Sequence, residues 1–250
     1  MVIPKNMEVF STTLIWILLI FFLGAFVRST FGFGDALIEM PLLALVISIK
    51  FATPIVAAYG IILAIAILFR EWEHINFQST WRLILSSAIG IPFGVYYLHV
   101  VPESVTKLIL GIILILIALF NLISPKQMFS IPQSSAYGFG FLAGILGSAY
   151  NTNGPPIILY SLTQKWDPAT FRATMQSYFL PVNLLIVISH ISAGLWQKET
   201  LQTFLIGLPV VLAAYVLGTF LAKRIETEKF NTAIYGVVFL MGGILISSIL

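Results

Sequence analysis

The chain is 250 residues long, with 59% hydrophobic residues and only 9% charged ones. This composition, together with several apolar runs of membrane-spanning length, indicates a protein that crosses a bilayer several times and excludes a soluble domain. The 13 basic and 10 acidic residues form no basic cluster, which excludes a nucleic-acid partner, and the absence of cysteine excludes disulfides and thiolate metal sites.

The first half of the chain is expected to hold five apolar segments. Residues 9–27 are long enough to cross a bilayer, and they end in a polar break at 28–35. Residues 36–48 are too short for a perpendicular span, so we expect a half-helix or a short packed helix there. Three longer segments complete this half, at 53–69, 81–99 and 104–123.

The second half repeats this order, with its own break at 148–156. When Gly34 is aligned with Gly154, Gly24 also falls on Gly144. We therefore predict an all-α polytopic membrane protein of two repeats, 1–124 and 125–250, each with a broken or re-entrant helical hairpin. The segments of the second repeat are expected at 134–149, 157–163, 169–190, 201–222 and 230–250.

Each repeat contributes an odd number of crossings whether or not its hairpin spans, so the second repeat is expected to be inverted. The basic residues then fall unequally on the two sides of the membrane. Because cytoplasmic loops carry more Lys and Arg, the richer side is predicted to be cytoplasmic, which places both termini outside. The richer side holds Arg70, Arg82, Lys126, Lys165, Arg172, Lys223, Arg224 and Lys229, and the other holds Lys5, Lys50, Lys107 and Lys198.

The two breaks are the predicted substrate site, with close helix packing as the alternative. Inside hydrocarbon, non-helical backbone is tolerated only where it is buried in protein or lines a wet cavity. We expect short helices to begin after Gly34 and after Gly154 with its Pro155–Pro156 pair, and a helix N-terminus favours anions. Arg28 adds a guanidinium group that can hold an oxyanion through two parallel hydrogen bonds.

The candidate substrate-binding residues lie on both breaks and on one later helix. Neutral donors such as Asn151 and Asn153 would orient an oxyanion without holding it too tightly to leave. Gln176 and Asn183 are one heptad apart and could line the path, with polar interhelical contacts as the alternative. The candidate set is Arg28, Thr30, Gly32, Gly34, Asn151, Thr152, Asn153, Gly154 and Gln176.

Three charged residues, Asp35, Glu39 and Arg172, are candidates for coupling or gating. Asp35 and Glu39 are four residues apart and share a helix face, where they could carry a proton or coordinate a cation. Alternatively, Arg28 or a network of donors neutralises them structurally, or Glu39 reaches the outer interface. Arg172 could instead be a positive-inside anchor that pairs with Asp167.

Other glycines and the histidines are interpreted structurally. Two glycine motifs are typical of close helix packing, Gly90-x-x-x-Gly94 and Gly140-x-x-x-Gly144. The three histidines lie at segment ends, where we expect them to be interfacial, and no pair has metal-ligand spacing. These are His74, His99 and His190. We therefore expect neither a metal nor a cofactor.

Two glycine-containing stretches, one at each break, resemble a known family. They are Phe-Gly-Phe-Gly-Asp-Ala-Leu-Ile-Glu-Met-Pro-Leu-Leu at 31–43 and the run Gly-x-x-x-Gly-Ile-Leu-Gly leading to Asn-Gly-Pro-Pro at 140–156. Both are similar to the sulfite exporter TauE/SafE family, also called TSUP. The resemblance covers nearly the whole chain and implies a secondary carrier for sulfite, thiosulfate or organosulfonates in a bacterial or archaeal cytoplasmic membrane. Asp35 and the polar residues before Gly154 depart from the family's fuller glycine run, so the particular anion stays open.

We therefore predict a carrier, not an enzyme, that binds a small oxyanion at the breaks and exposes it alternately to each side of the membrane. The alternative is a proton- or cation-coupled carrier of another metabolite, with Asp35 and Glu39 as primary ligands. An intramembrane enzyme would need a nucleophile with a base, or a metal set, and the sequence offers neither. A structural membrane subunit would bind no ligand. The expected partners are the anion and the bilayer, and both a monomer and a homodimer remain open.

Overall fold

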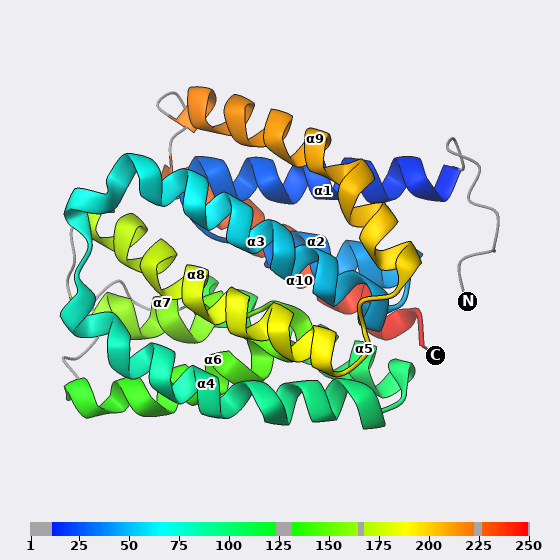
Figure 1. The fold of residues 1–250 in the computed structure, drawn as a ribbon, viewed down its shortest axis with the longest axis horizontal. Helices are drawn as coiled ribbons and strands as arrows, with labels where there is room; N and C mark the ends of the chain where they lie inside the picture. The colour runs from blue at the N-terminus through cyan, green and yellow to red at the C-terminus, as the bar shows by residue number, and fades with distance from the viewer. Residues whose placement is uncertain (1–11, 124–131, 165–167, 223–226, 250) are drawn as a thin grey trace. The chain divides into compact units, whose positions relative to one another are not determined.

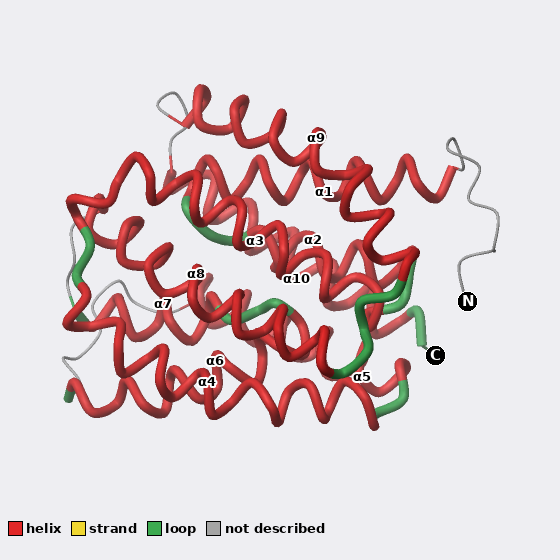
Figure 2. Tube along the Cα trace, in the orientation of Figure 1, coloured by secondary structure: helices red, strands yellow, loops and turns green. Residues whose placement is uncertain are grey.

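The computed structural model describes residues 12–123, 132–164, 168–222 and 227–249. This part of the chain consists of helices joined by turns and contains no strand (Figure 2), so the all-α fold is confirmed. The α-helices, labelled in Figure 1, are α1 (Thr12–Phe31), α2 (Asp35–Val46), α3 (Ile49–Glu71), α4 (Phe77–Val100), α5 (Glu103–Ile123), α6 (Ala136–Tyr150), α7 (Gly154–Thr163), α8 (Pro168–Ser192), α9 (Lys198–Leu221) and α10 (Thr227–Ser247).

Each apolar segment expected from the sequence forms a helix. Within the described residues, α1, α3, α4, α5, α8 and α9 are long and apolar enough to cross a membrane, which is the pattern of a multi-pass membrane protein. The helices that follow the two breaks, α2 and α7, have only 12 and 10 residues. They are about 18 and 15 Å long against a hydrocarbon core of about 30 Å, so they are short helices, as expected.

The helices group into two compact units. The first unit comprises Met1–Ile55, Val101–Ser124 and Lys198–Leu250, and the second comprises Val56–Val100 and Pro125–Gln197. Each unit combines helices from both halves of the chain, because packing joins segments that are distant in sequence. The repeat boundary at residue 124 and the inversion of the second repeat stay predictions.

In the first unit, α1 packs along α9 (Figure 1), and α5 packs along α10. Glycines make both contacts close. A methyl group on Gly218 of α9 would lie 2.7 Å from the carbonyl oxygen of Phe26 on α1, and one on Gly111 of α5 would lie 2.9 Å from that of Gly242 on α10. The short helix α2 folds back on α1 and also contacts α5 and α10. The break hairpin is therefore held by helices from both halves of the chain.

In the second unit, α4 and α6 pack closely through the two glycine motifs. A methyl group on Gly90 would overlap the carbonyl oxygen of Phe141, and one on Gly144 would overlap that of Ser87. The other two glycines of these motifs lie as close to the opposing helix. The predicted packing role is therefore confirmed. The short helix α7 packs on α6, and α8 packs on α4 and α6.

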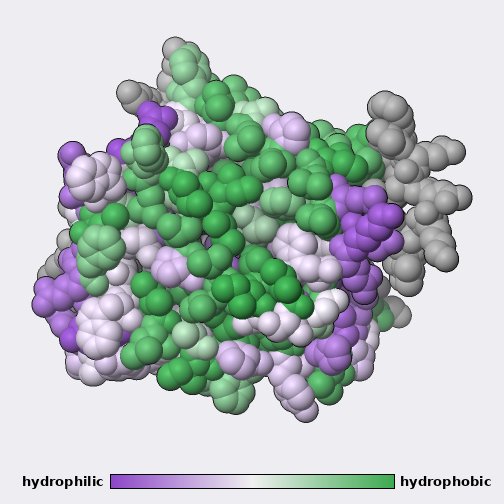
Figure 3. Space-filling model, viewed as in Figure 1, coloured by the Kyte–Doolittle hydropathy of each residue, from purple (hydrophilic) through white to green (hydrophobic). Residues whose placement is uncertain are grey.

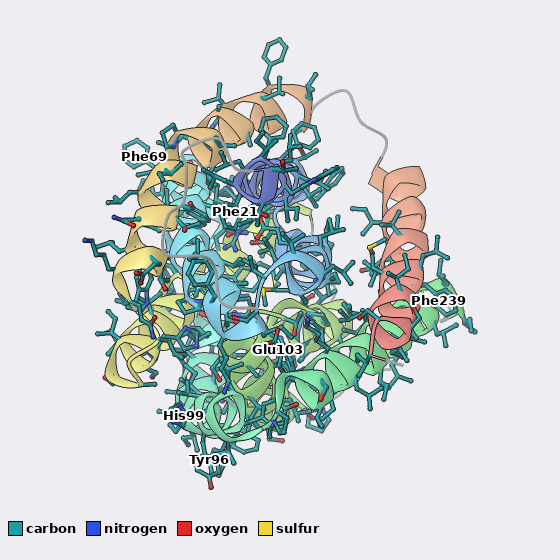
Figure 4. All side chains as sticks on the ribbon, turned by 90° about the vertical axis from the view of Figure 1, so that its right-hand side faces the viewer. Phe21, Phe69, Tyr96, His99, Glu103 and Phe239 are labelled. Atoms are coloured by element: carbon teal, nitrogen blue, oxygen red, sulfur yellow. The ribbon has the colours of Figure 1, made fainter. Side chains whose placement is uncertain are left out.

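Large apolar side chains are exposed on the surface of the helices. Phe69 of α3 is 87% exposed and projects outward, whereas Phe21 of α1 is 0% exposed (Figure 4). Hydrophobic residues cover most of the surface shown in Figure 3. Such a surface would promote aggregation in water, but it matches the acyl chains of a bilayer.

A methyl group added at Gly144 is expected to destabilise the second unit. In Gly144→Ala the new carbon would meet the Ser87 backbone, which cannot move without shifting α4, and overpacking of this kind costs about 1–3 kcal/mol. Gly138→Ala on the same helix is the matched control, because no atom lies within 4 Å of the added carbon. Unfolding in detergent should show a loss of stability for the first variant alone. Equal midpoints for the two variants would contradict the close packing of α4 on α6.

Candidate functional site

The first break is a short turn between α1 and α2 that depends on glycine. α1 extends to Phe31, so Arg28 lies in its last turn, and the Gly32 N–H donates to the Arg28 carbonyl at 2.7 Å. Gly32 and Gly34 have φ angles of 85° and 93°, in the left-handed region that glycine adopts without steric cost. α2 then begins at Asp35, directly after Gly34, where the sequence predicts it.

Arg28 and Asp35 face each other across this turn. Arg28 Nη1 donates to Asp35 Oδ2 at 2.8 Å, and the two side chains are 4% and 14% exposed. A hydrogen bond between two charged groups that are shielded from water is among the strong ones in proteins. Asp35 is therefore the immediate counter-ion of the arginine.

Thr30 lies in the contact between α1 and α9. Its hydroxyl group donates to the Phe26 carbonyl at 2.7 Å and reaches the Gly218 carbonyl of α9 at 3.3 Å. The neighbouring Ser29 hydroxyl reaches the Ala214 carbonyl at 3.5 Å. These hydroxyl groups join two helices that are distant in sequence.

Glu39 is buried against α1, one turn after Asp35. Its side chain fills a notch at Gly24, because a methyl group at Gly24 would overlap the Glu39 carboxyl group. Within the described part of the chain, this carboxyl group takes part in no hydrogen bond or ion pair, unlike that of Asp35. The two acids of α2 thus have different surroundings.

At the second break, backbone hydrogen bonds satisfy the carbonyl groups at the end of α6. α6 ends at Tyr150, and Asn151 adopts a left-handed conformation with a φ angle of 56°. The Asn151 N–H donates to the Gly147 carbonyl at 2.8 Å, and the Thr152 N–H donates to the Leu146 carbonyl at 3.3 Å. The bond from Asn151 to Gly147 is that of an αL cap, in which asparagine can replace the usual glycine at the left-handed position. The helix-terminal carbonyl groups are therefore satisfied at the break.

Asn153 and Gly154 connect this turn to α7. Asn153 Nδ2 donates to Asn183 Oδ1 on α8 at 3.2 Å, and Asn153 is buried. α7 begins at Gly154 and carries Pro155 and Pro156 in its first turn, where proline loses no intrahelical hydrogen bond. As at the start of α2, no side chain caps the N–H groups of this first turn.

His190 on α8 contacts the second break, although the sequence analysis expected it at the membrane interface. It is fully buried, and its Nε2 lies 2.9 Å from the carbonyl oxygen of Ser148, near the end of α6. The interfacial prediction is wrong for His190, because the packing of α8 brings this side chain against α6. His74 and His99 are exposed (Figure 4 shows His99), and their interfacial position stays a prediction. Nothing in the local sequence distinguishes the three histidines.

Gln176 and Arg172 lie near the start of α8. Gln176 is fully buried, and Arg172 is partly buried. Asp167, the expected partner of Arg172, lies outside the described residues. Asn183 makes the interhelical contact with Asn153, which is the second of the two roles expected for it. No group of three metal-ligating side chains occurs in the parts of the chain that the structure describes.

The predicted residues thus form two sets with different chemistry. Arg28, Asp35 and Glu39 bring three ionisable groups together in the first unit. The second set, in the second unit, is neutral and comprises residues 151–154 and Gln176. The first set can attract an anion by charge, and the second can orient one through N–H, amide and hydroxyl groups.

Removal of the Asp35 charge is expected to leave Arg28 buried without its counter-ion. Loss of one partner of a buried ion pair costs about 3–5 kcal/mol, so the unfolding free energy of Asp35→Asn should fall by about that amount. The double variant Arg28→Gln, Asp35→Asn should recover part of the loss. Glu103→Gln is the control, since its partner Lys107 lies at 3.3 Å and Glu103 is 37% exposed, and such pairs contribute less than about 1 kcal/mol. Equal losses in Asp35→Asn and Glu103→Gln would be inconsistent with this account.

Comparison with known protein families gives a match that includes both breaks. The family model described as "Sulfite exporter TauE/SafE" matches residues 17–245. A relative from Cupriavidus necator, named a probable sulfite/organosulfonate exporter TauE, is 23% identical over 181 residues, which cover 68% of each chain. No solved structure matches the chain. The chain belongs to the sulfite exporter TauE/SafE family.

Proposed function

We propose that this chain is a secondary carrier for a small sulfur-containing anion, such as sulfite, thiosulfate or an organosulfonate, in a prokaryotic cytoplasmic membrane. The observation that carries the proposal is the family match over residues 17–245, which includes both breaks. The name of the Cupriavidus necator relative supports the same class of substrate.

The first break is the proposed charged part of the anion site. Arg28 is buried beside the start of α2, so an oxyanion there would meet a guanidinium group together with the N–H groups and dipole of a helix N-terminus. Thr30, Gly32 and Gly34 are proposed to shape the turn around the anion. Asp35 competes for the guanidinium group, which keeps the affinity low enough for release.

The second break is proposed to supply neutral contacts to the anion. Asn151, Thr152, Asn153 and Gly154 offer backbone and side-chain donors without a net charge. Gln176, buried on α8, is proposed to add an amide donor. Neutral donors fix the orientation of an oxyanion and add little to the electrostatic attraction that must be overcome when it leaves.

The proposed mechanism is alternating access, in which the site faces one side of the membrane at a time. Export of an anion needs no coupling ion, because the inside-negative potential supplies about 2.3 kcal/mol per elementary charge per 100 mV. Uptake would need one, and Asp35, Glu39 and Arg172 are the proposed coupling or gating residues. Binding and release suffice for this function, without covalent chemistry.

The purified protein is expected to be stabilised by its anion. A ligand that binds only the folded state adds about 2.7 kcal/mol of stability at one hundred times its dissociation constant. We expect a selective rise in the unfolding midpoint with sulfite, thiosulfate or sulfoacetate, compared with sulfate, taurine and chloride at constant ionic strength. Arg28→Gln should abolish the rise, whereas Lys107→Gln, on the partly exposed Lys107 of α5, should keep it.

The same measurement can refute the proposal. No shift with any sulfur anion would do so. A shift that follows pH or sodium, with no response to anions, would instead favour a cation-coupled carrier of another metabolite.

The orientation proposed for the chain places both termini outside the cell. The loop between α3 and α4 is then cytoplasmic, and the loop between α4 and α5 is external. Because the chain has no cysteine, Glu73→Cys and Pro102→Cys each introduce a single thiol at an exposed position in one of these loops. A membrane-impermeant maleimide should label Pro102→Cys in intact cells and Glu73→Cys only after permeabilisation. The opposite labelling pattern would place the termini inside.

A further inference from the structure

The two carboxyl groups of α2 differ in their partners. Asp35 is held by Arg28 at 2.8 Å. Glu39 is 3% exposed and fills the notch at Gly24, and within the described part of the chain its carboxyl group has no hydrogen bond or ion pair. Of the two acids, Glu39 is therefore the one whose charge is not directly balanced.

Few charged groups surround Glu39. Those that act on it are Asp35 and Arg28. On the helices that contact α2, the described ionisable side chains are Arg28 of α1, Glu103 and Lys107 of α5, and Tyr235 of α10. The helix that follows, α3, carries Lys50, Tyr59 and Arg70. Glu103 and Lys107 pair with each other at 3.3 Å. The charge balance at the first break is thus set by Arg28, Asp35 and Glu39.

The protonation of Glu39 decides the net charge that an incoming anion meets. With Glu39 ionised, two negative groups surround one positive group, and an anion that approaches Arg28 is repelled. With Glu39 protonated, Asp35 and Arg28 cancel, and the repulsion is removed. Such coupling is reciprocal, so a proton that helps the anion to bind is itself held more firmly once the anion is bound.

We propose that Glu39 is a proton-binding site linked to anion binding at Arg28, so that a proton accompanies each anion. This inference rests on the anion site proposed above. Anion binding weakens as the pH rises and Glu39 loses its proton. Glu39→Gln has the shape of the protonated side chain and cannot ionise, so it retains anion binding and removes the pH dependence.

The test measures proton uptake when the full-length protein in detergent binds thiosulfate or methanesulfonate, neither of which takes up a proton near neutral pH. Titration calorimetry in buffers of different ionisation enthalpy gives the number of protons bound per anion. The wild type should take up as much as one proton per bound anion. Its affinity for the anion should fall by up to tenfold for each unit by which the pH rises. Glu39→Gln should take up none. Glu103→Gln, the same change at the start of α5 (Figure 4), is the matched control and should behave as the wild type.

Several outcomes would overturn the assignment. A wild type that binds either probe without proton uptake, or a Glu39→Gln variant with undiminished uptake, refutes the role of Glu39 and leaves the proposed function intact. Absence of binding to either probe and to sulfite refutes the proposed function itself. If sulfite alone binds, its own protonation is subtracted by comparison with Glu39→Gln. If that variant does not fold, Glu39→Asp should keep the uptake with a shifted pH midpoint, and an unshifted midpoint overturns the assignment.

Discussion

Each helix break leaves backbone N–H and C=O groups that must find partners, because an unpaired group inside a membrane costs several kcal/mol. At both breaks, the end of the first helix meets this constraint within a few residues, whereas no side chain caps the N–H groups at the starts of α2 and α7. The Gly32 N–H binds the Arg28 carbonyl, and the N–H groups of Asn151 and Thr152 close α6. His190 of α8 contacts a further carbonyl near the end of α6. These contacts close the C-terminal ends of α1 and α6.

The two breaks satisfy the same constraint with different residues, and this difference determines their chemistry. The first break depends on two glycines in the left-handed region and carries a buried arginine with its counter-ion. The second break changes direction at Asn151, which has a positive φ angle, and the hydrogen bond between Asn153 and Asn183 connects it to α8. One break therefore offers charge, and the other offers neutral donors.

Local sequence suffices to predict every helix, because bilayer thickness fixes the length of an apolar run and glycine and proline mark where α2 and α7 begin. It does not predict which helices become neighbours. The contact of Thr30 with α9, the insertion of Glu39 at Gly24 and the contact of His190 with α6 all depend on tertiary packing. Each of these contacts joins residues on different helices, so none of them leaves a signal in local spacing or periodicity.

Close packing restricts how either hairpin can move. Gly218 brings α9 onto α1, and Gly144 brings α6 onto α4, with backbone contacts that leave no room for a methyl group. Tightly packed interfaces change between discrete arrangements and do not slide continuously. In an alternating-access cycle, each hairpin would then move with its partner helix, and local adjustment would be confined to the turns at 32–34 and 151–153. An anion at a break would contact both a rigid helix end and an adjustable turn, and such a difference in contacts is what a ligand needs in order to shift a protein between two states.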